Sequence, residues 1–312
     1  MLDVLYAVLV GPFKDMIGAP SFLVEVMIGG LAAGLMYSLV ALGFVLIYKA
    51  SGVFNFAQGV MVLFAALTLV GLMERGVPMV IALGLTMAVM IALAFAIERV
   101  VLRPLVNQEQ IILFMATIGL NFFLEGFGEL VWGSNVKRLD VGIPDTSFMI
   151  AGVQINRLEL TAAVTAAVLV AIMAVFFQRT RIGRALRAVA DDHEAALSIG
   201  IPLNTIWITV WSVAGLVAIV AGIMWGAKSG VQFSLSLIAL KALPVLILGG
   251  FTSVPGAVAG GLIIGLGEKL AEVYWGPLVG GAIENWFAYV LALAFLLFRP
   301  QGLFGERIIE RV

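Results

Sequence analysis

Apolar runs of membrane-spanning length follow one another along almost the entire chain, separated by short polar segments. A helix that crosses a bilayer needs about 20 mostly apolar residues, and fewer where it is broken and buried inside the protein. This criterion predicts nine spans, at 22–47, 60–73, 79–97, 111–131, 158–177, 203–225, 237–248, 257–274 and 284–298. One short element would also suit a re-entrant position, so we expect an all-α polytopic transmembrane bundle of eight or nine spans.

The polar segments between these runs differ in kind. Residues 53–59, VFNFAQG, interrupt the apolar pattern between the first two spans with two amide side chains. Residues 132–157 are longer and rich in Gly, Pro, Asn and Asp, which form turns, so a small hairpin is predicted there. No segment has the composition of a soluble domain, and residues 1–312 are expected to form a single transmembrane domain.

The densest charge lies in residues 178–203, QRTRIGRALRAVADDHEAALSIGIPL. Residues 184–196 contain good helix formers and neither Gly nor Pro, which predicts a short helix. Gly200 suits a helix C-terminus, and Pro202 just beyond it cannot extend a helix. We therefore expect a charged helix that projects from the apolar body and binds a partner protein.

Composition supports a membrane protein, with 62% hydrophobic and 12% charged residues. A soluble domain has about 45–50% hydrophobic and about 25% charged residues. The 35 glycines suit helices that approach closely in lipid, and pairs four residues apart occur at 30/34 and 261/265. A net charge of −1 gives no basis for binding nucleic acid. Without cysteine and with one histidine, the chain is expected to hold no metal or cofactor.

The distribution of Lys and Arg predicts an orientation. If 178–203 is cytoplasmic, with its four arginines, alternation of the spans also places inside Lys49, Arg99, Arg103, Arg299, Arg307 and Arg311. The other side then receives Lys14, Arg75, Lys137, Arg138, Arg157, Lys228 and Lys241. The positive-inside rule favours this arrangement, which puts the N-terminus outside, the C-terminus in the cytoplasm and 132–157 in the periplasm.

Several motifs carry a resemblance to a known family. Glu194-Ala195-Ala196-Leu-Ser-Ile-Gly200 resembles the coupling motif of ABC importer permeases, which docks into a groove on a cytoplasmic ATPase. The stretches 34–48 and 52–59 are similar to the first-span signature of branched-chain amino-acid ABC permeases of the H-type. The glycine-rich turn 249–261 and the closing RPQGLFG at 299–305 resemble later motifs of that family. One departure is Gln58, where many members carry His, so no protonation role is inferred there.

The resemblance implies a non-catalytic, multi-pass subunit of a bacterial inner membrane. Its partners would be ABC ATPase subunits, a second permease of the M-type and a periplasmic binding protein. The substrate would be a branched-chain or other hydrophobic amino acid, or, as in relatives, an amide or urea. By the same resemblance, Ala195, Ala196 and Gly200 would pack against the ATPase. Charged residues would form the rim of this contact, namely Arg181, Arg184, Asp192 and Glu194.

The sequence also gives a reason, independent of the resemblance, to place ATP hydrolysis on another protein. No G-x-x-x-x-G-K-[ST] phosphate loop is present, and GAKS at 226–229 fails because its Gly and Lys are not adjacent. ATP hydrolysis is therefore expected on a separate partner protein.

Five polar residues are candidates for the translocation pathway. Asn55 and Gln58 lie in the interruption between the first two spans, where they would either line the path or cap helix ends. Thr117, Asn121 and Glu125 recur at i, i+4 and i+8 on one face of the fourth span. They would face a pathway or form interhelical hydrogen bonds, or, in the case of Glu125, lie at the depth of the membrane interface.

A second class of function is an ion-coupled transporter or channel that works without an ATPase. Such a protein needs ionisable residues near the bilayer midplane. The candidates here are Glu125 and Glu268, although Glu268 is expected near the outer interface.

Overall fold

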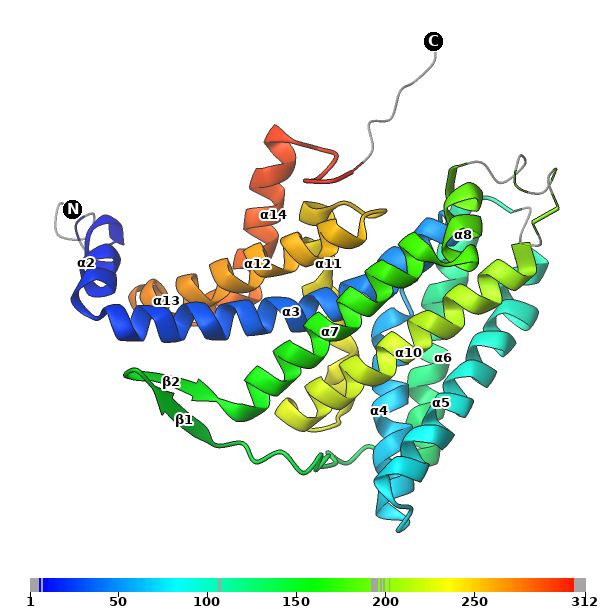
Figure 1. The fold of residues 1–312 in the computed structure, drawn as a ribbon, viewed down its shortest axis with the longest axis horizontal. Helices are drawn as coiled ribbons and strands as arrows, with labels where there is room; N and C mark the ends of the chain where they lie inside the picture. The colour runs from blue at the N-terminus through cyan, green and yellow to red at the C-terminus, as the bar shows by residue number, and fades with distance from the viewer. Residues whose placement is uncertain are drawn as a thin grey trace.

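The computed structural model describes residues 6, 8–105, 108–191, 196, 198, 200–201 and 203–305, and helices dominate it (Figure 1). The helices are α2 (Gly11–Gly18), α3 (Pro20–Ser51), α4 (Gln58–Glu74), α5 (Met79–Ala96), α6 (Gln110–Trp132), α7 (Arg157–Arg179), α8 (Arg181–Asp191), α10 (Leu203–Ser229), α11 (Ile238–Gly249), α12 (Val254–Tyr274), α13 (Gly276–Val279) and α14 (Phe287–Phe298). α5 continues through a π-helical turn, Ile97–Leu102, and a 3₁₀ turn, Arg103–Leu105. Further 3₁₀ turns, Phe233–Leu237 and Ile283–Asn285, precede α11 and α14.

Each predicted span corresponds to a helix. Among the described residues, six helices are long and apolar enough to cross a membrane, and three shorter apolar helices cover Gln58–Glu74, Phe233–Gly249 and Phe287–Phe298. The predicted all-α polytopic bundle is therefore confirmed. Helix α3, with 32 residues, extends beyond the predicted 22–47 at both ends, and the helix that begins with α5 continues to Leu105, beyond the predicted 97.

The hairpin that the turn residues of 132–157 predict is also present. Strands β1 (Ser147–Ile150) and β2 (Val153–Asn156) pair antiparallel, with Ile150 opposite Val153. The two residues between them, Ala151 and Gly152, have φ of 50° and 82°. Positive φ at both central positions is the requirement of the tight two-residue turn that matches the twist of paired strands.

Local sequence signals explain where several helices begin and end. Gly52, with φ of 68°, ends α3 and donates its N–H to the carbonyl of Tyr48. The side chain of Asn156 accepts a hydrogen bond from the N–H of Glu159 at the start of α7. Ser253 does the same for α12 through the N–H of Gly256. These side chains pair backbone groups that a helix terminus leaves without a partner.

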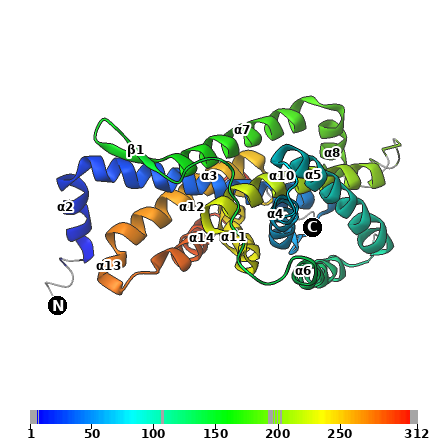
Figure 2. The same cartoon turned by 90° about the horizontal axis from the view of Figure 1, so that it is seen from below.

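Helix α3 is the centre of the bundle, with α7 on one side and α12 on the other (Figure 2). Its contact with α12 is made by glycines four residues apart on each helix. A Cβ on Gly34 would lie 2.4 Å from the carbonyl oxygen of Gly261, and a Cβ on Gly265 would lie 2.4 Å from the Cα of Gly34. The two backbones therefore touch directly, as small residues allow in membrane helices.

Contacts near the helix termini define two ends of the bundle. At the hairpin end, the backbone N–H of Gln154 in β2 donates to Glu25 near the start of α3. At the same end, Lys137 forms an ion pair with Glu74 at the end of α4 and a backbone bridge with Val231, just after α10. Figure 1 shows the hairpin at the start of α7 and α8 at its far end.

The opposite helix termini lie at the other end of the bundle, which contains α8. The apolar side chains of Leu186 and Val189 on α8 are buried in the core, and α8 packs on α3, α7 and α10. The chain that follows α14 returns to the turn after α11, because Leu303 N–H donates to Leu248 O and Phe304 N–H to Gly249 O. The segments 132–157 and 178–191 thus lie at opposite ends of the bundle.

Candidate functional site

The break between α3 and α4 brings together three of the five predicted pathway residues, Asn55, Gln58 and Thr117, all of them buried. Asn55 Oδ1 accepts from the N–H of Ala57 at 3.1 Å, just before α4 begins. Thr117 Oγ1, from α6, accepts from the N–H of Phe56 at 3.0 Å. Asn55 and Thr117 therefore supply partners for backbone N–H groups in the segment between α3 and α4.

Gln58 differs from its neighbours because its side-chain amide is buried without a partner. Neither Nε2 nor Oε1 has a hydrogen bond to the described residues. The amide lies directly against the backbone of α3, where a Cβ on Gly43 would be 2.0 Å from Nε2. A buried amide with all its hydrogen-bonding capacity unused is uncommon in native proteins and points to a water or another molecule as its partner.

Asn121 and Glu125 lie further along α6 and are only half-buried. Glu125 is eight residues from Thr117, about 12 Å along the helix axis. It lines a shallow hollow with Phe122, Glu129 and Phe233. The structure therefore brings Thr117 to the α3–α4 break and leaves Glu125 on a more open part of the same helix.

The 3₁₀ turn at 233–237 is the part of this site that the sequence reasoning missed. The carbonyl oxygen of Ser236 would lie 2.1 Å from a Cβ on Gly59, so this turn sits directly on the start of α4. A small apolar hollow between them is lined by residues that include Phe54, Phe56 and Leu240. The apolar run 237–248 is unusually short, and this was the feature of the sequence that could have indicated the turn. A second broken span, with the 233–237 turn before α11, explains the short run.

The hydroxyl of Thr117 is expected to be needed for this local structure. Thr117→Val keeps the shape of the side chain but leaves the N–H of Phe56 without its acceptor, and such a loss costs about 1–3 kcal/mol. We expect a clear fall in the apparent Tm of the purified protein, with Thr117→Ser close to wild type. Equal melting temperatures for the valine and serine variants would contradict this role.

A buried ionic cluster joins three helices close to the hairpin end. Glu268 on α12 is 5% exposed, and its Oε1 accepts from the hydroxyl of Tyr37 on α3 and from Nζ of Lys241 on α11, both at 3.0 Å. Lys241, which the orientation prediction counted for the outer side, lies inside α11 and is paired within the bundle. Glu268 is enclosed by protein, and its pairing with Lys241 meets the need of a charge inside an apolar bundle for a partner.

The segment predicted to couple to an ATPase contains α8, which Thr180 caps by accepting from the N–H of Gly183 at 3.0 Å. Leu186 and Val189 face the core, whereas Arg181 and Arg184 are exposed. The predicted helix at 184–196 is confirmed over 184–191. The predicted residues Asp192, Glu194 and Ala195 lie outside the described residues.

Gly200 has the backbone conformation of a helix C-terminus, as predicted. Its φ is 82°, and the N–H of Ile201 donates to the carbonyl of Ala196 at 3.0 Å. This is the bond pattern of a helix terminus closed by a left-handed glycine. The side chain of Ala196 is 1% exposed and belongs to this chain's own core, whereas Gly200 is exposed.

A bundle of apolar spans with two broken helices in contact and a charged helix at one end defines a multi-pass membrane transport protein. Residues 26–299 match the family described as branched-chain amino acid transport system, permease component. The chain therefore belongs to this family of permease components, and the resemblance noted from its motifs is confirmed.

Relatives of similar length support the assignment. The chain is 30% identical to the high-affinity branched-chain amino acid transport system permease protein BraD of Pseudomonas aeruginosa, over 92% of this chain and 97% of the relative. It is 28% identical to the corresponding protein LivH of Escherichia coli K12, over 93% and 98%. A probable LivH of Methanocaldococcus jannaschii is 27% identical over 86% and 88%. A solved structure, PsaBC from Streptococcus pneumoniae in complex with Fab, covers 93% of this chain with 15% identity and a TM-score of 0.44.

Proposed function

We propose that this chain is the H-type permease subunit of an ATP-driven ABC importer for branched-chain amino acids. The observation that carries the proposal is the family match over residues 26–299 on a bundle that presents a charged helix at one end. The relatives are described as components of branched-chain amino acid transport systems, which favours these substrates over amides or urea. ATP hydrolysis would take place on partner ATPases.

In this proposal the α8 end faces the cytoplasm of a bacterial cell and the hairpin end faces the periplasm. The α8 end carries Lys49, Arg99, Arg103, Arg299 and the four arginines of 179–187, whereas Lys241, counted above for the other side, lies inside α11 beside Glu268. The positive-inside rule supports this orientation. The N-terminus would be periplasmic, the C-terminus cytoplasmic, and a periplasmic binding protein would dock at the hairpin end.

The coupling contact would use the exposed side of residues 181–200. Leu186, Val189 and Ala196 fix the segment to the bundle, so movement of a bound ATPase would be transmitted to α3, α7 and α10. The exposed Arg181, Arg184 and Gly200 would meet the ATPase together with Ala195, and Asp192 and Glu194 would complete the charged rim. Such rim charges set the register and rate of docking.

The translocation pathway would pass the face where the α3–α4 break meets the 233–237 turn. Gln58 offers its unpartnered amide there, and Asn55 and Thr117 hold the break in place. Large apolar side chains on the same side are exposed, among them Phe122 on α6 and Leu237. The second, M-type permease would cover this face, with Asn121 and Glu125 lining the path between the subunits.

The proposal is tested by separating ATP hydrolysis from transport in the reconstituted complex. Gly200→Val forces a β-branched residue into a left-handed conformation, a strain of about 1–3 kcal/mol that would distort the end of the coupling segment. We expect leucine uptake to fall about tenfold or more while the chain still inserts and ATP is still hydrolysed, and we expect the same of Glu194→Lys. Gly84→Val makes the same substitution on an open face of α5, away from both proposed docking ends, and should transport normally.

The same assay identifies the substrate class. Competition by unlabelled leucine, isoleucine and valine, and none by urea or acetamide, is the expected result. Wild-type uptake in both coupling variants, or uptake that persists in ATP-free liposomes lacking the ATPases, would overturn the proposal.

A further inference from the structure

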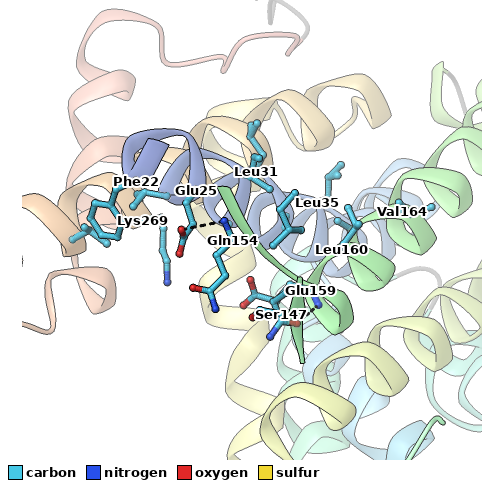
Figure 3. Close-up of a pocket in the computed structure, with 18 of the residues that line it drawn as sticks. Phe22, Glu25, Leu31, Leu35, Ser147, Gln154, Glu159, Leu160, Val164 and Lys269 are labelled. Atoms are coloured by element: carbon cyan, nitrogen blue, oxygen red, sulfur yellow. Dashed lines mark hydrogen bonds between the residues drawn. The ribbon is translucent and has the colours of Figure 1, made fainter. Parts of the chain in front are cut away.

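A groove on the outside of the bundle is charged at one end and apolar along its floor (Figure 3). Its volume is about 600 Å³, and it lies between the first half of α3, the β1–β2 hairpin, the first half of α7 and the end of α12. None of the residues assigned above to coupling or to the pathway lines it. The groove is therefore separate from the coupling contact and from the pathway proposed above.

The charged end of the groove holds groups of both signs. Glu25 Oε2 accepts a hydrogen bond from the backbone N–H of Gln154 at 3.4 Å but has no cationic partner among the described residues. Glu159 is paired with Lys228 at 2.7 Å. Lys269 makes no hydrogen bond or ion pair within the described part of the chain. Two carboxylates, Glu25 and Glu159, and two ammonium groups, Lys228 and Lys269, give this end of the groove no net charge.

The space between the unlike charges lies above Gly29. A Cβ on this glycine would be 4.0 Å from Glu159 Oε2 and 3.9 Å from Lys269 Cε, so these two atoms are at most 7.9 Å apart. They do not pair across this gap. A ligand that carries an ammonium and an anionic group close together would complement both sides at once, and each contact would be a charge-assisted hydrogen bond.

The floor of the groove is apolar, and the groove is open along α7. Leu31 and Leu35 of α3 face Leu160 and Val164 of α7, beyond the charged groups (Figure 3). Val164 is 54% exposed, and the same face of α7 continues at four-residue spacing with exposed Val168 and Ile172. A free amino acid would leave this stripe uncovered, whereas an acyl chain running along α7 would cover it.

We propose that this groove binds one zwitterionic aminophospholipid from the membrane leaflet at the hairpin end. Its ammonium would lie between Glu25 and Glu159, its phosphate beside Lys269, and an acyl chain on the floor formed by α3 and α7. A lipid with a net negative head would meet two carboxylates without supplying an ammonium, so the site selects the neutral zwitterion. The inference does not depend on which solute the permease carries.

Native mass spectrometry of the intact transporter complex tests the site. The purified complex is stripped of lipid and then given equal amounts of phosphatidylethanolamine and phosphatidylglycerol with the same acyl chains. We expect one phosphatidylethanolamine per copy of this chain to be retained preferentially. Glu25→Gln should weaken its retention about tenfold, as expected for the loss of one charge-assisted hydrogen bond.

Gly29 offers a matched pair of variants for the same measurement. Gly29→Ala adds a Cβ at ordinary contact distance and should retain the lipid, whereas Gly29→Met extends a side chain between Glu159 and Lys269 and should exclude it. Elution of both variants at the wild-type volume in size-exclusion chromatography confirms that they fold. Equal retention of the two lipids by the wild type, or displacement of the bound lipid by leucine, would overturn the proposal, the second outcome indicating an amino-acid site.

Discussion

Replacing Gly265 by valine is expected to prevent α12 from packing on α3 and to abolish the folded bundle. A Cβ at this position would lie 2.4 Å from both Cα and N of Gly34 and 2.5 Å from the carbonyl oxygen of Gly30. These are backbone atoms, so no side chain can rotate away and the two helices must separate. Overpacking usually costs about 1–3 kcal/mol, and the clash here involves the backbone of the central helix, so we expect at least about 3 kcal/mol.

The control for this experiment is a glycine on an open helix face. Gly84 lies in α5 with no heavy atom within 4 Å of its Cβ position. Gly84→Val therefore changes the same side chain without a packing conflict and should elute and melt like wild type. A monodisperse, thermally stable Gly265→Val protein would contradict the close α3–α12 contact.

Lys241→Met is the second change with a large expected effect. It removes the cation beside Glu268, which is buried between α3, α11 and α12 with its Oε2 unpaired among the described residues. Breaking a buried ion pair by removing one partner costs about 3–5 kcal/mol, because the remaining charge is left uncompensated. We expect a loss of about 3 kcal/mol, since Lys241 itself is partly exposed.

A double variant separates this effect from a simple loss of packing. Glu268→Gln combined with Lys241→Met leaves no charge, and the amide oxygen can still accept from Tyr37, so most of the stability should return. Lys228→Met provides a second control, because the Lys228–Glu159 pair is more exposed and should contribute no more than about 1 kcal/mol. Equal melting temperatures for the single variant Lys241→Met and the double variant would show that charge is not the cause.

The sequence predicted the spans well because a bilayer imposes a strong constraint on length and polarity. Each of the nine apolar runs became a helix, and the polar interruption at 53–59 became the break before α4. Gly200 ended a helix as predicted, since a left-handed conformation favours glycine. These features depend on residues close together in the chain, which a single sequence displays.

Contacts between distant residues were not predictable in the same way. Lys241 was counted among the cations of the outer side although it lies within the short run 237–248. Its partner Glu268 lies 27 residues further on, in another helix. The 233–237 turn and the 53–59 break are each recognisable as irregular, but nothing in the sequence states that they touch. Of the five pathway candidates, Thr117 was brought to the break by the way α6 packs on α4, whereas Glu125 was left on a more open surface.

Local sequence patterns were enough to predict the apolar helices, the start of the charged helix, the hairpin and several helix ends. The tertiary structure alone decided which helices touch, where Glu268 finds its cation, and which charged groups surround the groove above Gly29. The physical reason lies in the membrane. A soluble helix reveals its inner face by one apolar stripe, but a helix in lipid is apolar all round, so small residues and rare polar groups decide its neighbours.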